Sequence, residues 1–145
     1  MEIETLTQLL NIPGVKVTEI IKDEGNKLYL RVEASEVKPA ICSGCGERHE
    51  SVHSISEVTV EDLRISGKRV FLVLKKRKMK CPKDEKIHVE KIDWVKERFT
   101  KRFAIEISRL TAITTNQEAG WYLGLDDEKV YRIDKKILEE GAKKN

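Results

Sequence analysis

The sequence predicts an α+β fold, in which a β-rich half (residues 1–92) precedes a half made of three helices (residues 93–145). The β-rich half is recognised by a long run, Arg69–Lys80, whose apolar start suits a strand buried on both faces and whose end is basic. From about Trp94 the apolar period changes from two residues to about 3.6, which is typical of a helix. The residues that share one face of that helix are Phe99, Phe103, Ile107 and Leu110.

The β-rich half is expected to begin with a short helix and a hairpin. Residues 3–10 place leucines at helical spacing, and a proline-containing turn ends the helix. Two runs rich in β-branched residues, 15–22 and 27–33, flank a four-residue turn. Gly25 and Asn26 can supply the positive φ that a tight hairpin turn needs.

Turn and capping residues place the remaining elements. Ser66 and Gly67 form a turn between a short strand and the long strand. Threonine and aspartate are good N-terminal caps, so Thr115 and Asp126 can begin the last two helices. Gly124 breaks the second helix and Gly141 ends the third. The three helices are therefore expected at residues 100–113, 116–123 and 127–140.

Composition limits the class of protein. The 145 residues suit one compact domain or two small ones, and 39% hydrophobic residues allow a modest core. A net charge of +3 excludes a polybasic arm, so a nucleic-acid surface would need local clustering of the 28 Lys and Arg residues. The start has no signal-peptide pattern and no apolar run could span a bilayer, so a cytoplasmic protein is expected.

Three cysteines form the strongest chemical motif. Cys42 and Cys45 make a CxxC pair, and Cys81 lies at the end of the long strand, where a second pair of zinc ligands belongs. Asp84 occupies the second position of that pair, whereas His88 carries the better zinc-binding group. We expect a closed, structural zinc site with His88 or Asp84 as the fourth ligand.

Other interpretations of the cysteines stay open. His49 and His53 lie near the first pair and are further candidate ligands. The three thiols could also be buried without a metal. A thioredoxin-like redox pair is not favoured, because the residues after Cys45 indicate turn and strand rather than a helix.

Residues 116–133 fit a helix-turn-helix unit. Ala119 and Gly120 are small where two helices must cross closely, and Gly124 stands where the turn needs positive φ. An αα-hairpin that binds nothing fits the same pattern, because the pattern specifies packing rather than DNA. The basic outer face of the last helix favours DNA, although the acidic residues 126–128 in its first turn repel phosphate.

The candidate DNA contacts are basic and aromatic residues of the long strand and of the helical half. A charged run on a strand is also typical of a solvated edge that prevents aggregation, and both interpretations stay open. The candidates are Lys76, Lys78, Lys80, Lys101, Arg102, Lys129, Tyr131, Arg132, Lys135 and Lys136.

Five segments, taken in chain order, resemble the N-terminal region of insertion-sequence transposases of the ISL-three type. They are LLNIPGVKV, ICSGCG, VEDLRISGKRVFLVLKKRKMKCP, IDWVKERFTKRF and LGLDDEKVYRIDKKILEE. The resemblance implies a zinc ribbon (Cys42, Cys45, Cys81 and a fourth ligand) and a helix-turn-helix, which together bind the terminal inverted repeats of the element. The second knuckle departs from the family pattern CPxCG or CPxHG, because Asp84 occupies the ligand position.

The resemblance also implies a catalytic domain downstream, with an acidic triad that holds divalent metal ions. Because the sequence stops at Asn145, we expect a DNA-binding module that does not itself cut DNA. Its expected partner is double-stranded DNA, and no membrane partner is expected. A homodimer stays open as an alternative to a monomer. The alternative function is a protein-interaction or regulatory module derived from a transposase fragment, in which Trp121 and the acidic turn face a partner protein.

Overall fold

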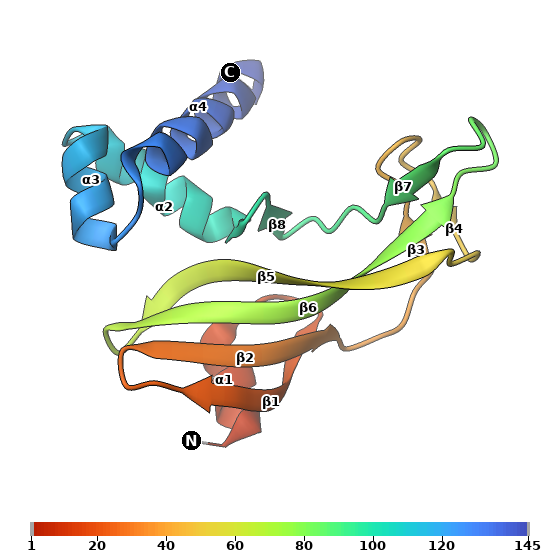
Figure 1. Cartoon of the computed structure of the whole chain (residues 1–145), viewed down its shortest axis with the longest axis horizontal. Helices are drawn as coiled ribbons and strands as arrows, with labels where there is room; N and C mark the ends of the chain where they lie inside the picture. Colours follow the sequence, from red (N-terminus) through yellow and green to blue (C-terminus); the bar gives the residue numbers. More distant parts are fainter. Residues whose placement is uncertain (1, 145) are drawn as a thin grey trace.

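The structure, a computed structural model, describes residues 2–144 and combines a large mixed sheet with four helices (Figure 1). The elements in chain order are α1 (Ile3–Leu10), β1 (Val15–Asp23), β2 (Lys27–Ala34), β3 (Ala40–Ile41), β4 (Arg48–His49), β5 (Ser54–Ile65), β6 (Lys68–Lys80), β7 (Ile87–Val89), β8 (Val95–Lys96), β9 (Phe99–Thr100), α2 (Lys101–Thr111), α3 (Asn116–Leu123) and α4 (Asp127–Lys144).

The large sheet has the strand order β1-β2-β6-β5-β9-β8, and β7 pairs with the far end of β6. The pairs β2–β6 and β5–β9 are parallel, and the other pairs are antiparallel. Strands β3 and β4 form a separate two-stranded sheet. The long strands β5 and β6 therefore form a ribbon that has the three C-terminal helices α2–α4 at one end and β3, β4 and β7 at the other (Figure 1).

Local sequence explains the two hairpins of the sheet. In the β1–β2 turn, Gly25 adopts a φ of +86°, and its N–H donates to the Asp23 carboxylate. In the β5–β6 turn, Ser66 and Gly67 have φ values of +50° and +77°, as a tight hairpin that matches the sheet twist requires. Asn26 has no positive φ, so the expectation for that residue was wrong.

The main core lies on one face of the sheet. Leu6 and Leu10 of α1 pack there against the apolar side chains of β1, β2, β5 and β6. Ile92 and Trp94 pack against the same core. They belong to residues 90–94, which connect β7 to β8 and are called the linker below. The linker is therefore held against the sheet.

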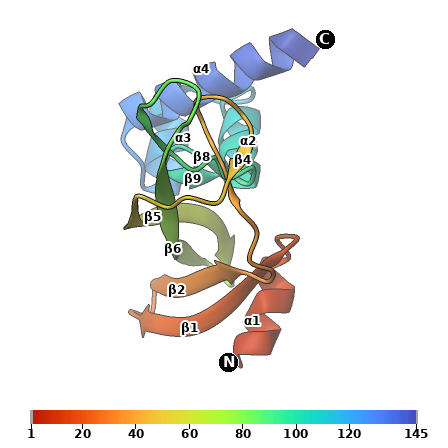
Figure 2. The same ribbon diagram turned by 90° about the vertical axis from the view of Figure 1, so that its right-hand side faces the viewer.

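The three C-terminal helices have a core of their own. Phe103 and Ile107 of α2 meet Leu123 of α3 and Val130 and Ile133 of α4. The N–H groups of the first turns of α2 and α3 donate to the hydroxyl groups of their threonine caps. This helical unit (α2–α4) lies at the opposite end of the molecule from α1 (Figure 2).

Buried charges join the helical unit to the sheet. Asp62 of β5 is 1% exposed and accepts hydrogen bonds from Thr100 and from the guanidinium of Arg102. Arg64 donates to the Leu123 carbonyl at the end of α3, which satisfies a helix-terminal acceptor. Because β9 also pairs with β5, the sheet continues past residue 92, where the sequence suggested a boundary.

The α+β class is confirmed, and the expected helices occur at the expected places. Helix α4 continues through Gly141 to Lys144, so that glycine does not end it. Strand β5 is longer than the expected short strand, and the two-residue strands β3, β4, β8 and β9 were not anticipated. Within residues 2–144, no helix combines the length and apolarity needed to cross a membrane.

Candidate functional site

The first metal-binding turn spans Cys42 to Gly46, between β3 and β4. The Cys42 carbonyl accepts a hydrogen bond from Gly46 N–H at 2.8 Å, and the Cys42 N–H donates to the Glu47 carbonyl at 2.8 Å. Gly46 has a φ of +76°, a conformation that glycine adopts without strain. These constraints bring the sulfur atoms of Cys42 and Cys45 to one side of the turn.

Residues 81–86 form a second turn of the same design at the end of β6. The Cys81 carbonyl accepts from Glu85 N–H at 2.8 Å, and the Cys81 N–H donates to the Lys86 carbonyl at 2.9 Å. Glu85, with a φ of +61°, holds the place that Gly46 holds in the first turn. The backbone therefore retains a complete zinc-knuckle geometry even though Asp84 replaces the second cysteine.

His49 brings the fourth donor to the three sulfur atoms. It lies on β4, opposite Ala40 of β3, so the short hairpin returns its ring to the first turn. His49 Nε2 is 3.1 Å from Cys45 Sγ and 4.0 Å from Cys81 Sγ. The donor atoms of Cys42, Cys45, His49 and Cys81 all lie within 4.8 Å of one another.

This donor set fits a zinc ion. Zinc–sulfur bonds of about 2.3 Å in a tetrahedron place ligand atoms about 3.8 Å apart, close to the observed spacing. Burial opposes ionisation of the Cys42 thiol, but the N–H groups of Cys45 and Gly44 donate to its sulfur, and its pKa is lowered. Four protein donors close the coordination sphere, as in structural rather than catalytic zinc sites.

The two ligands preferred from the sequence lie outside this donor group. His88 Nε2 pairs with the Asp84 carboxylate at 2.6 Å, and the Asp84 carboxylate also accepts from Lys86 N–H. The His88 ring covers Gly44, where an added Cβ would come within 2.5 Å of Nε2. Asp84 and His88 therefore form contacts that hold the second turn against the first. His53, the other candidate metal ligand, is exposed.

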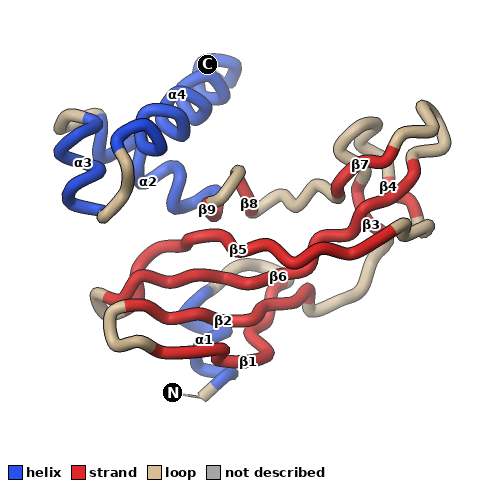
Figure 3. The backbone as a smooth tube through the Cα atoms, in the orientation of Figure 1, coloured by secondary structure: helices blue, strands red, loops and turns tan. Residues whose placement is uncertain are grey.

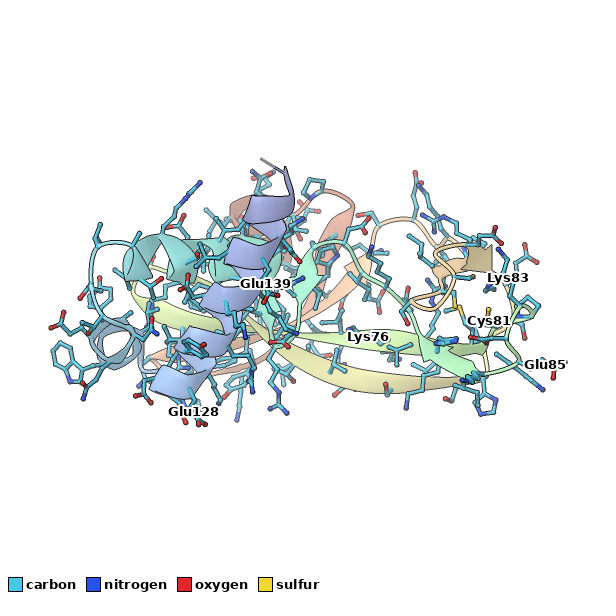
Figure 4. All side chains as sticks on the ribbon, turned by 90° about the horizontal axis from the view of Figure 1, so that it is seen from above. Lys76, Cys81, Lys83, Glu85, Glu128 and Glu139 are labelled. Carbon is cyan, nitrogen blue, oxygen red and sulfur yellow. The ribbon has the colours of Figure 1, made fainter. Side chains whose placement is uncertain are left out.

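Figure 3 shows that the metal-binding turns are loops at the end of the sheet farthest from the helical unit. Seen from above, the sulfur atoms gather beside Cys81, with Lys83 and Glu85 on the outer turn (Figure 4). The Lys83 ammonium pairs at 2.9 Å with Glu47, the residue that follows the first turn. This ion pair is exposed, so it contributes little to stability.

The basic residues of β6 differ in their surroundings. Lys80 is exposed, whereas Lys76 and Lys78 are half-buried. Lys76 lies midway along the molecule, between the metal-binding turns and α4 (Figure 4). Arg77, which points to the other face, pairs with Glu90 of the linker at 2.7 Å.

The basic residues of α4 fall into two groups. Tyr131 and Lys135 lie on the outermost face, together with the acidic Glu128. The spacing i, i+3 and i+7 places the other group, which we call the basic flank, along one side of the helix. It consists of Lys129, Arg132 and Lys136.

Contacts of the basic flank and of α2 show which of these side chains are already engaged. Arg132 and Lys136 pair with Glu97 of the β8–β9 turn. Arg102 holds the buried Asp62, so its guanidinium is committed to the fold. Lys101 is half-buried and forms no ion pair within residues 2–144.

The sequence indicated His49 only as a further candidate ligand and did not single out Lys91, which lies near Lys101. The spacing Cys45-x3-His49 is the signal that could have favoured His49. Lys91 carries no motif, and only the folded linker places it beside other lysines.

Two facing knuckles with three cysteine sulfur atoms and one imidazole define a zinc-ribbon centre. Residues 38–84 match the family described as the zinc-finger of transposase IS204/IS1001/IS1096/IS1165. The chain is 27% identical over 132 residues to the transposase for insertion sequence element IS1001 of Bordetella parapertussis. That alignment covers 90% of this chain and 32% of the relative. No solved structure matches the chain.

These similarities confirm the resemblance to insertion-sequence transposases that the sequence motifs indicated. The zinc ribbon and its metal are supported twice, by the family match and by the donor geometry. The chain spans about a third of the length of the curated relative that it matches.

Proposed function

We propose that this chain is a DNA-binding module of a transposase and that it recognises the ends of an insertion sequence. The observation that carries the proposal is the transposase-type zinc ribbon, joined through the sheet to a helical unit with a basic flank on α4. Zinc would be held by Cys42, Cys45, Cys81 and His49, and when bound it supplies a rigid cross-link between the two turns.

The geometry of α3 and α4 supports a helix-turn-helix role. A three-residue turn joins the helices, and Gly124 takes the left-handed conformation, with a φ of +72°. At Gly120 an added Cβ would come within 2.6 Å of the Leu125 carbonyl, so only glycine allows this close approach. In such units the second helix, here α4, contacts base edges in the major groove.

The charges of α4 suggest how it would approach DNA. Asp127 and Glu128 in its first turn favour the helix dipole but repel phosphate. The basic flank, by contrast, keeps positive charge for the backbone, because Lys129 forms no ion pair within residues 2–144 and Arg132 and Lys136 share the single acid Glu97. We therefore assign backbone contacts to Lys129, Arg132 and Lys136, and base contacts to Tyr131 and Lys135. The role is binding rather than cutting.

A second candidate is a protein-interaction module, and one observation favours it. Trp121 is 86% exposed and the adjacent Tyr122 is 71% exposed, both on α3. Exposed aromatic side chains of this size are enriched in protein interfaces. In this alternative, α3 and the acidic first turn of α4 would face a partner protein.

A binding assay separates the two candidates. Labelled duplex carrying the terminal repeat of the element, and a scrambled duplex, are titrated at 50 and 200 mM salt with the wild type and with a Lys129→Glu/Lys135→Glu variant. A DNA-binding module prefers the repeat, weakens with salt and is impaired by charge reversal. Binding with no sequence preference and no salt response would reject the first candidate. Trp121→Ser serves as the matched change that should affect only the second.

A further inference from the structure

A hollow of about 670 Å³ lies between the zinc ribbon and the helical unit. Ser43 and Val89 line it on the side of the zinc ribbon, and Glu97 and Glu140 line it on the side of the helices. The linker crosses it, so we call it the linker hollow. Four lysines from four separate segments line the hollow: Lys76 of β6, Lys91 of the linker, Lys96 of β8 and Lys101 of α2.

The cations of the linker hollow exceed its acids once existing ion pairs are considered. Glu90, Glu97 and Glu140, which all line it, are already paired with Arg77, with Lys136 and Arg132, and with Lys96. Within residues 2–144 this leaves three lining lysines without an ion pair, against Asp93 alone. Those lysines are Lys76, Lys91 and Lys101.

These charges also influence one another across the hollow. Partial burial lowers the pKa of the Lys96 ammonium, and the nearby Lys136 and Lys101 lower it further. The basic flank of α4 borders the same region, because Arg132 and Lys136 both reach Glu97. An anion in the hollow would relieve this repulsion between lysines that the fold holds close together.

The zinc ribbon fixes the position of the linker. Lys91 N–H donates to the Ile41 carbonyl at 2.7 Å, and Ser43 N–H donates to the Val89 carbonyl at 3.3 Å. Cys42 itself forms a β-bridge with Glu90. The segment that carries Lys91 is therefore attached directly to the first metal-binding turn, so the shape of the hollow depends on that turn.

We propose that the linker hollow binds backbone phosphates of duplex DNA through Lys76, Lys91 and Lys101. The duplex would then lie across both the zinc ribbon and the helical unit, and zinc would act on DNA binding by holding the linker in place. This inference rests on the proposed DNA-binding function and adds the place where the backbone is held. Phosphate contacts of this kind fix the position of a protein on DNA without reading its sequence.

The test uses the zinc-loaded full chain and a labelled duplex between 50 and 300 mM salt. The variant is Lys91→Gln/Lys101→Gln. The matched control is Lys16→Gln/Lys27→Gln, which removes the same charge from the opposite face of the sheet. Each lost phosphate contact lowers the slope of log K against log salt by about 0.9, so the variant should lose about 1.8 in slope and bind about 30-fold more weakly at 0.15 M salt. The control should change affinity less than about threefold.

Each outcome bears on a different claim. If wild type binds duplex but the variant weakens no more than the control, the hollow is not the phosphate site and the proposed function stands. If wild type binds no duplex, both fail. Heparin is titrated in parallel with the duplex. If the variant loses as much affinity for heparin as for duplex, the assignment of the hollow to duplex DNA is overturned. Circular dichroism and the zinc content of each protein exclude misfolding. The Lys76→Gln variant, which changes a lining lysine on strand β6, gives a second measure of phosphate binding in the hollow.

Discussion

Replacement of His49 by alanine gives the sharpest test of the metal centre. Apparent zinc-binding free energies of about 10–16 kcal/mol for four-ligand structural sites correspond to about 2.5–4 kcal/mol per ligand if shared equally. Loss of His49 should therefore weaken zinc binding by about 10²- to 10³-fold. His88→Ala and Asp84→Ala should each cost less than about tenfold, because neither side chain contributes an atom to the donor group.

The assay is competition for zinc with a chromophoric chelator. Cobalt substitution gives an independent readout, since the visible bands of Co²⁺ report tetrahedral coordination and thiolate ligands. His53→Ala is the matched control, because it removes a nearby exposed histidine that lies outside the donor group. His49→Cys should restore tight binding and so distinguish ligand loss from misfolding. A larger loss for His88→Ala than for His49→Ala would refute the assignment.

Three stability predictions follow from other contacts. Arg102→Ala should lower the free energy of unfolding, measured by urea denaturation, by about 2–3 kcal/mol, because it leaves the buried Asp62 carboxylate without its cation. Arg109 forms only an exposed ion pair, so Arg109→Ala should change that free energy by less than about 0.5 kcal/mol. Gly120→Ala should destabilise the protein by about 1–3 kcal/mol, because the added Cβ clashes with the Leu125 carbonyl. Gly141 has open space around it, so Gly141→Ala should stabilise α4 by up to about 1 kcal/mol. Equal effects of the two substitutions in thermal unfolding would contradict this prediction. Glu85→Gly should stabilise the zinc-loaded protein by about 1 kcal/mol, because glycine adopts the positive φ of that turn freely. A lower melting temperature of this variant would refute the equivalence of the two knuckles.

The sequence was most informative where one residue type performs one local task. Cysteine spacing together with the alternation of β6 was enough to bring Cys81 to the first pair. The 3.6-residue apolar period placed α2, and the caps Thr115 and Asp126 together with Gly124 placed α3 and α4, at nearly the correct residues. The helix boundaries depend on neighbours within a few positions, so propensity and capping rules describe them well.

Features that depend on the returning chain could not be predicted in the same way. His49 rather than His88 joins the metal-ligand group because of the β3–β4 hairpin. The strands of this hairpin are only two residues long, so they give no periodic signal in the sequence. Coordination chemistry alone favours His88 over Asp84, but the fold places that ring over Gly44. The two-residue strands β8 and β9 are defined by their pairing with each other and, for β9, with β5, rather than by a local pattern. The linker hollow likewise has no signature in the sequence, because residues between Val89 and Lys101 meet Ser43, Lys76 and Glu140 there only in the folded chain.

A zinc-dependent scaffold that presents cations to duplex DNA should bind it in a way that depends on both salt and zinc. The most direct measurement is the equilibrium affinity for duplex as a function of salt, made with zinc-loaded protein and again after zinc is removed with a chelator. We expect log K to fall by about 3 or more per tenfold rise in salt for the zinc-loaded protein, because at least three phosphate contacts form. Zinc removal should weaken binding and reduce this slope. A flat salt response, or identical curves with and without zinc, would contradict it.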